Sequence, residues 1–183
     1  MGILESAIAL ARKYHHGQYR KYTQPGMPPE EFFVHPFSVY ERVRDVPGSD
    51  GVVQAAAVLH DVVEDTACTL DEIVFHCGEA VASIVDELTN RASVDPEVKK
   101  LRRAERKQID RERLAKASVW AKKIKLIDRA YNLRDMGGAP DKFKAIYLNE
   151  SRSLYSVLCG VDETLEAEYE QAMSDLEKSI REY

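Results

Sequence analysis

Residues 50–65 constrain the fold more than any other part of this chain of 183 residues. An unbroken apolar run, Ala-Ala-Ala-Val-Leu at 55–59, turns polar at once at His60 and Asp61. The run predicts a buried helix over residues 50–63. An imidazole and a carboxylate buried side by side at its end cost free energy unless a partner offsets that cost. A metal ion is the usual partner for such a mixture of groups.

Two further residues fit the same site. His35 precedes a proline, and Asp128 ends the run Lys-Leu-Ile-Asp at 125–128. With His60 and Asp61 they give two imidazoles and two carboxylates, a nitrogen and oxygen set that suits one divalent cation such as Mn²⁺, Fe²⁺ or Mg²⁺. The alternative is a core histidine that is hydrogen-bonded to a neighbour. The remaining histidines, at positions 15, 16 and 76, stand at expected helix ends before glycine, and we interpret them as C-terminal helix residues rather than ligands.

Composition predicts one soluble globular domain over residues 1–183. Hydrophobic residues make up 44% of the chain and charged residues 31%. No apolar run approaches the length of a membrane span, and the first residues carry no secretion signal. The three cysteines are odd in number and have no Cys-x-x-Cys spacing, so we expect reduced thiols in a cytoplasmic protein, with a homo-oligomer as one possibility.

Helical periodicity runs through nearly every segment, and the chain shows no internal repeat and no strand pattern. The sequence therefore predicts an all-α fold, a multi-helix bundle of about eight to ten helices. Apolar residues three and four apart mark the first helix and the last one. Residues 22–29 are too rich in proline and glycine for a regular element. The other helices are expected at 35–46, 70–77, 96–117, 119–136 and 140–158, and an apolar stripe at 81–88 indicates one more.

Two sets of polar residues are expected to face the centre. Glu64 follows His60 by four residues and Asp65 follows Asp61 by four, so one helix end would aim all of them at one place. Carboxylates there can activate water and protonate a leaving group. The alternative for Glu64 and Asp65 is a polar helix end. Asp128, Asn132 and Asp135 likewise share one face of the helix at 119–136.

Residues 96–125 are strongly basic, with twelve Lys and Arg against four Asp and Glu, whereas the whole chain carries −5. One interpretation is a solvated helix face. The other is an electropositive rim that attracts a polyphosphate toward the metal. Nucleic-acid binding is disfavoured, because few aromatic residues interleave with the charges and the protein is acidic.

Several motifs, in this order, are similar to those of one enzyme family. They are His-Gly-Gln-Tyr-Arg-Lys at 16–21, Val-His-Pro at 34–36, Leu-His-Asp-Val-Val-Glu-Asp-Thr at 59–66, Val-Asp-Glu-Leu-Thr at 85–89, and Ile-Lys-Leu-Ile-Asp-Arg-Ala-Tyr-Asn-Leu-Arg at 124–134. The chain resembles the HD-type hydrolase domain of the Rel/SpoT alarmone enzymes and the small stand-alone alarmone hydrolases. The resemblance implies an HD-domain bundle that removes the 3′-pyrophosphate from guanosine tetra- or pentaphosphate, and no membrane partner.

The resemblance also implies roles for individual residues. One Mn²⁺ would be bound by the four ligands named above, and Glu64 and Asp65 would manage the attack of water. Arg20 would stack on the guanine base.

At the substrate, Lys21 and Asn132 would contact phosphate and ribose, and Arg134 and Asp135 would complete the binding site. Three departures leave the substrate open. The loop at 20–35 is longer than in the family, a carboxylate stands at Asp135 where a small hydroxyl residue is usual, and residues 90–117 differ.

Three functions therefore remain. The first is an alarmone 3′-pyrophosphohydrolase. The second is the same chemistry on another phosphorylated nucleotide or cofactor, such as a 2′- or 3′-phosphate. The third is a non-catalytic nucleotide sensor, against which the complete set of ligand and acid/base residues argues.

Overall fold

The computed structural model describes residues 2–22 and 26–181, and within these ranges it confirms the all-α fold. The described residues form twelve α-helices, more than the eight to ten expected, and one 3₁₀ helix, η1. They contain no strand, only an isolated bridge between Tyr19 and Glu31. The helices are α1 (Ile3–Tyr14), α2 (Val34–Arg44), α3 (Gly51–Leu59), α4 (Val62–Asp65), α5 (Leu70–Cys77), α6 (Glu79–Leu88), α7 (Arg91–Val94), α8 (Pro96–Lys100), α9 (Arg103–Lys116), α10 (Val119–Arg134), η1 (Asp135–Gly138), α11 (Asp141–Leu158) and α12 (Glu163–Arg181).

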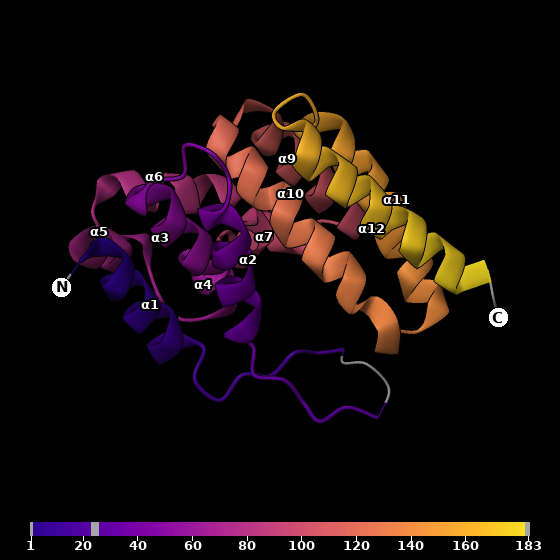
Figure 1. Cartoon of the computed structure of the whole chain (residues 1–183), viewed down its shortest axis with the longest axis horizontal. Helices are drawn as coiled ribbons and strands as arrows, with labels where there is room; N and C mark the ends of the chain where they lie inside the picture. Colours follow the sequence, from indigo (N-terminus) through magenta and orange to yellow (C-terminus); the bar gives the residue numbers. More distant parts are fainter. Residues whose placement is uncertain (1, 23–25, 182–183) are drawn as a thin grey trace.

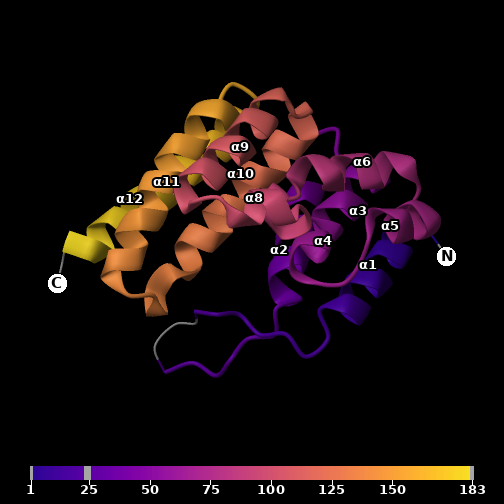
Figure 2. The same cartoon turned by 180° about the vertical axis from the view of Figure 1, so that it is seen from behind.

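Helix α10 joins the two halves of the bundle. It packs against α2 and α6 of the N-terminal half and against α11 and α12 of the C-terminal half (Figure 1). Its buried face, which includes Ile124, Leu126 and Leu133, explains this position, because apolar side chains on several sides of one helix need neighbours on each side. The two termini lie at opposite ends of the molecule, as the reverse view also shows (Figure 2).

The expected helix at 50–63 is interrupted, which corrects the sequence prediction. Helix α3 begins after Asp50, whose carboxylate accepts the backbone N–H groups of Val52 and Val53, both at 3.0 Å. It ends at Leu59, and His60 and Asp61 form the turn before the four-residue helix α4. The two site residues therefore lie at a helix break, where both keep right-handed helical dihedral angles.

Two other boundaries differ from the prediction. The helix expected over 96–117 is divided into α8 and α9, which are separated at Leu101 and Arg102. Helix α10 ends at Arg134, and the chain tightens into η1 before it reaches α11. A short tight turn at the end of a helix is a common way of satisfying the last carbonyl groups.

The loop between α1 and α2 is held by backbone hydrogen bonds between its two ends. Arg20 N–H donates to Glu30 O and Phe32 N–H donates to Gln18 O, both at 2.9 Å. The irregular segment predicted at 22–29 agrees with the residues described here, whereas residues 23–25 lie outside them. In the described part of the chain, no helix is long and apolar enough to cross a membrane.

Candidate metal centre and active site

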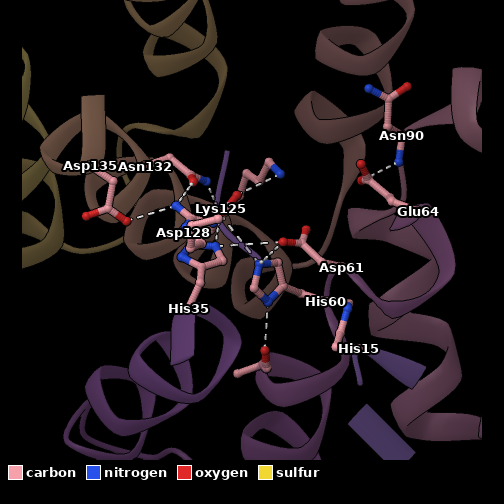
Figure 3. A network of polar contacts seen from close by, with 12 residues as sticks. His15, His35, His60, Asp61, Glu64, Asn90, Lys125, Asp128, Asn132 and Asp135 are labelled. Carbon is pink, nitrogen blue, oxygen red and sulfur yellow. Dashed lines mark hydrogen bonds and ion pairs between the residues drawn. The ribbon is translucent and has the colours of Figure 1, made fainter. Parts of the chain in front are cut away.

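Three separate parts of the chain bring the four predicted ligands together. His35 comes from α2, His60 and Asp61 from the turn after α3, and Asp128 from α10 (Figure 3). Four donor atoms, one from each residue, lie within 4.8 Å of one another. His35 Nε2 is 3.0 Å from Asp128 Oδ1, and His60 Nε2 is 3.2 Å from Asp61 Oδ2. The four predicted ligands therefore lie close together, although the helix that carries His60 and Asp61 breaks after Leu59.

The chemistry of this cluster fits a divalent cation. His60 Nδ1 lies 2.8 Å from the carbonyl oxygen of Ala57, so it donates to that oxygen and leaves Nε2 facing the centre. His60 Nε2 is buried, and although carboxylate oxygens of Asp61 and Asp128 lie 3.2 and 3.5 Å away, it makes no hydrogen bond of good geometry with any described residue. A buried nitrogen without a partner is costly, and coordination to a metal would satisfy it. Two imidazoles and two carboxylates suit Mn²⁺, Fe²⁺ or a similar ion.

Asp128 is the most connected member of the centre. Its Oδ2 pairs with Lys125 Nζ at 2.8 Å, and its Oδ1 accepts from the Asn132 amide at 2.6 Å. Burial alone would raise the pKa of this carboxyl group, but Lys125, His35 and His60 outweigh burial and hold it well below its usual range. Asp128 is therefore a carboxylate at all ordinary pH values, as a metal ligand must be.

Asp61 and His60 form a second charged pair. Burial opposes the charged form of Asp61, but His60 beside it and His35 nearby lower its pKa to about 2. Burial likewise opposes the charged imidazolium, yet Asp61 and Asp128 raise the pKa of His60 well above 6.5. The carboxylates thus create a strongly negative centre, which attracts a proton or a cation to the same position.

Glu64 and Asp65 reach the centre from two sides rather than at the one place that the sequence predicted. Glu64 accepts the backbone N–H of Asn90 at 2.7 Å (Figure 3) and lines a cavity that Asp61 and Asp128 also reach. Asp65 lines the pocket that contains Arg20, together with Asp61. The helical relation from Asp61 to Asp65 is kept, since Asp65 N–H donates to Asp61 O at 3.0 Å, whereas Glu64 is one residue earlier and leaves the helix in another direction.

Both carboxyl groups have raised pKa values. Burial and the negative charge of Asp61 raise the pKa of Glu64 to about 7, although Lys125 partly offsets them. Desolvation on the pocket side, followed by the charge of Asp61, raises the pKa of Asp65 to about 6. Values this close to neutrality are typical of groups that exchange protons during catalysis.

A pocket of about 260 Å³ opens beside the centre on the side of Arg20. We call it the Arg20 pocket; its lining residues are Arg20, Lys21, Tyr22, Phe32, Asp61, Asp65, Asn132, Asp135, Met136, Phe143 and Tyr147. Four aromatic rings in this lining suit a flat heterocyclic base.

Arg20 is fixed in this pocket by polar partners. It donates to Asn132 Oδ1 at 2.9 Å and to Asp135 Oδ2 at 2.8 Å, and its guanidinium lies 5.6 Å from the centre of the Phe32 ring. An unpaired carboxylate at Asp135 would repel a phosphate. The structure instead pairs this carboxylate with Arg20, which neutralises its charge.

The other two predicted substrate residues have different positions. Lys21 is exposed at the pocket mouth, where its Nζ lies 5.2 Å from the Tyr22 ring centre. Arg134 corrects the prediction, since it contacts α12 through Glu168 O at 3.5 Å and lines a shallow surface groove with that helix. The side chain of Arg134 points away from the Arg20 pocket because Arg134 is two residues after Asn132, and helix residues at i and i+2 do not share a face.

Sequence reasoning missed His15. Its ring is buried, with 2% of its surface exposed, and Nδ1 lies 2.8 Å from Gln18 Oε1, to which it donates. Burial lowers the pKa of His15, so the ring is neutral and Nε2 is an acceptor. This Nε2 has no partner among the described residues and lies near Asp61 and His60 (Figure 3). Gly17 after this helix led us to interpret His15 as a C-terminal helix residue. The unpaired nitrogen becomes visible only in the fold.

A second cavity meets the centre on the side of Glu64. It measures about 190 Å³, and Asp61, Asp128 and Asn132 reach it from the metal centre. We call it the Lys107 cavity, because Lys107 on α9 lies in its wall together with Glu64 and Asn90. The basic segment predicted at 96–125 thus contributes a wall of a cavity at the centre rather than only an exposed face.

The fold and the four ligands define an HD-type protein, and a model of the HD domain family matches residues 7–162. The chain belongs to this family.

Among curated relatives, the chain is 40% identical over 135 residues to the human guanosine-3′,5′-bis(diphosphate) 3′-pyrophosphohydrolase MESH1, which covers 73% of this chain and 69% of the relative. It is 30% identical over 162 residues to the Vibrio cholerae guanosine-3′,5′-bis(diphosphate) 3′-pyrophosphohydrolase, covering 85% of this chain but 21% of that longer protein. Among solved structures, it is similar to a metazoan ortholog of SpoT described as hydrolyzing ppGpp. That similarity has a TM-score of 0.81 and 28% identity, and it covers 96% of both chains.

Proposed function

We propose that this chain is a metal-dependent guanosine-3′,5′-bis(diphosphate) 3′-pyrophosphohydrolase. The observation that carries the proposal is the cluster of His35, His60, Asp61 and Asp128, located where an aromatic pocket meets a cavity lined by both basic and acidic side chains. The curated relatives with this activity, at about 40% identity, support the same conclusion.

In the proposed reaction, water attacks the phosphorus atom that is bonded to the ribose O3′. The bond between that phosphorus atom and O3′ breaks. The O3′ atom takes up a proton, and the products are GDP and pyrophosphate. A divalent cation on the four ligands would polarise a phosphoryl oxygen and lower the pKa of a bound water molecule. We propose Mn²⁺ as that cation, because the donor set is mixed nitrogen and oxygen.

The positions of the two carboxyl groups suggest different tasks. Asp65 lines the Arg20 pocket, where base and ribose would bind, so it is placed to donate the proton to O3′. Glu64 lies on the other side, from which an in-line attack would come, so it is placed to accept the proton of water. Lys125 holds Asp128 in position and balances its charge.

The substrate residues act through the Arg20 pocket. Arg20 offers its planar guanidinium for contact with a purine, and Asn132 and Asp135 fix its orientation. Lys21 is close enough to the mouth to supply a positive charge to the 5′-diphosphate. We propose a single catalytic domain and a cytoplasmic location, in keeping with the three free cysteines.

A hydrolysis screen tests this function. The purified chain would be incubated with Mn²⁺ or Mg²⁺ and with guanosine 3′,5′-bis(diphosphate), GDP, GTP and nucleotides that carry a 2′- or 3′-monophosphate. Products would be identified by chromatography and phosphorus NMR. We expect GDP and pyrophosphate from the first compound, in a metal-dependent reaction that Asp128→Ala abolishes. No turnover of that compound with any metal would refute the proposal.

A second candidate is a phosphohydrolase that acts on another phosphorylated nucleotide or cofactor. The ion pair between Arg20 and Asp135 favours it, because both groups are already satisfied before a base binds. In the screen, this candidate predicts faster release of orthophosphate from a monophosphate than of pyrophosphate from the alarmone. Binding without turnover of any compound would instead indicate a nucleotide sensor.

A further inference from the structure

Three cationic side chains near the metal centre have no partner. Lys99 on α8 and Arg106 and Lys107 on α9 make no side-chain hydrogen bond or ion pair with any other described residue. This is unusual in the chain, whose other cations near the centre are engaged. Lys125 pairs with Asp128, and Arg103 pairs with Glu150 at 2.5 Å.

These three cations line a pocket of about 350 Å³, in which Glu64 is the one acidic residue. We call it the outer basic pocket. It shares Lys107, Glu64 and Asn90 with the Lys107 cavity, and that cavity reaches Asp61 and Asp128. The two spaces therefore connect the metal ligands with the outer basic pocket on the side of Glu64 and Asn90, which Figure 3 shows away from Asp135. The wall of the Lys107 cavity is mixed in charge, with basic and acidic side chains in similar number, whereas the outer basic pocket is cationic.

Lys107 occupies the decisive place on this path, since it alone of the three cations lines both spaces. Burial and the positive charges of Arg129 and Lys125 lower its pKa, and Asp110 and Glu150 offset this only in part, so the ammonium group is held there at a cost. An anion beside it would remove that cost. Phosphate is well suited, because an ammonium group donates up to three hydrogen bonds to its oxygens.

The geometry points to a subsite for the distal phosphate: we propose that Lys107, supported by Arg106 and Lys99, binds the β-phosphate of a 3′-pyrophosphate and retains it in the pyrophosphate product. This inference rests on the proposed function. With the nucleoside in the Arg20 pocket and the scissile phosphorus at the metal centre, the next phosphate enters the Lys107 cavity. The subsite makes the enzyme select a pyrophosphate over a monophosphate at the 3′ position.

The test compares Lys107→Met with wild type. Methionine keeps the length of the side chain and removes the charge. Lys100→Met is the matched control, because Lys100 is exposed on α8, pairs with Glu97 at 2.6 Å and lines neither space. Lys107→Arg restores a positive charge. Circular dichroism would verify the fold of each variant.

Calorimetry on the Mn²⁺-loaded chain would measure binding of inorganic pyrophosphate and of orthophosphate. Loss of one charge-assisted hydrogen bond, about 1.5–3 kcal/mol, corresponds to roughly 10- to 100-fold weaker binding. We expect Lys107→Met to weaken pyrophosphate binding by that factor and orthophosphate binding less than about twofold. Lys107→Arg and Lys100→Met should bind pyrophosphate as wild type does. Unchanged pyrophosphate binding in Lys107→Met, or equal loss for both anions, overturns the subsite.

Kinetics separate this inference from the function on which it rests. Lys107→Met should raise KM for the 3′-pyrophosphate nucleotide and leave KM for a 3′-monophosphate nucleotide unchanged. If wild type cleaves no 3′-pyrophosphate, the proposed function fails, while the calorimetric comparison still decides whether Lys107 binds pyrophosphate. If wild type cleaves it and Lys107→Met keeps both KM values, the function stands and the subsite falls.

Discussion

Replacement of Glu64 by glutamine tests the proposed acid/base chemistry most directly. The amide oxygen of glutamine can still accept the Asn90 N–H, which Glu64 now binds at 2.7 Å. The variant therefore keeps the contact with the start of α7 and loses only the titrating carboxyl group. Because Glu64 is not among the metal ligands, one Mn²⁺ per chain should still bind. We expect turnover to fall by roughly two to four powers of ten, the usual contribution of a general acid or base.

The same variant should change how stability depends on pH. The pKa of Glu64 is about 7 in the folded protein and 4.5 as an ordinary value, so the native state holds this proton more tightly than the unfolded state. The stabilisation is complete below pH 4.5 and is lost as the pH rises through 7. At about 1.4 kcal/mol for each pH unit between these values, the loss is on the order of 3 kcal/mol.

Urea denaturation of the metal-free protein at pH 5 and pH 8 would measure this difference. We expect the free energy of unfolding of wild type to fall more between the two pH values than that of Glu64→Gln. Glu41→Gln is the control, because Glu41 is exposed on α2 and should leave both turnover and the pH dependence unchanged. Full turnover in Glu64→Gln would demote Glu64 to a structural residue, and identical pH dependence would show that its pKa is not raised.

Four further variants address the centre and the Arg20 pocket. Asp128→Ala should abolish both Mn²⁺ binding, measured by elemental analysis, and hydrolysis; a bound equivalent of metal in this variant would contradict the ligand set. Arg20→Ala should raise KM for a nucleotide with unchanged metal content, and Asp135→Thr should do so to a smaller degree because it only releases Arg20; wild-type KM in both would exclude them from substrate binding. His15→Phe keeps a ring beside Phe32 but removes the buried acceptor Nε2, to which a water molecule at the centre could donate. We expect kcat to fall while metal content and KM stay constant. Unchanged kcat would show that Nε2 binds no water that takes part in the reaction.

The fold class and the ligand cluster could be predicted because both depend on local signals. Apolar spacing identified the helices, and the abrupt polarity at His60 and Asp61 marked the centre. The break after Leu59 gave no such signal, since Val62 and Val63 continue the apolar pattern of α3 and both are buried. Periodicity measures burial, and buried residues on both sides of a tight turn look like one helix.

Side-chain directions were the part that the sequence could not supply. Glu64 faces the Lys107 cavity rather than the Arg20 pocket, and its carboxylate accepts a backbone N–H that lies 26 residues further along the chain. Arg134 follows the surface of α12, and the unpaired Nε2 of His15 depends on the packing of Phe32 and the metal ligands around it. Contacts of this kind are tertiary, and no local pattern encodes them.

One amide couples the metal centre to the Arg20 pocket. Asn132 donates through Nδ2 to Asp128 at 2.6 Å and accepts through Oδ1 from Arg20 at 2.9 Å. A carboxylate accepts from one end of this amide and a guanidinium donates to the other, so the amide can take only one orientation. The bond to Asp128 therefore helps to orient Asn132 for its bond to Arg20, and the reverse also holds. Asp135 accepts from the same Arg20 nitrogen at 2.8 Å, which completes a chain of bonds from a metal ligand to the pocket. A substrate that displaces Arg20 removes one hydrogen bond of Asn132, whose other hydrogen bond is to Asp128. Binding of the base can therefore affect the metal centre through Asn132.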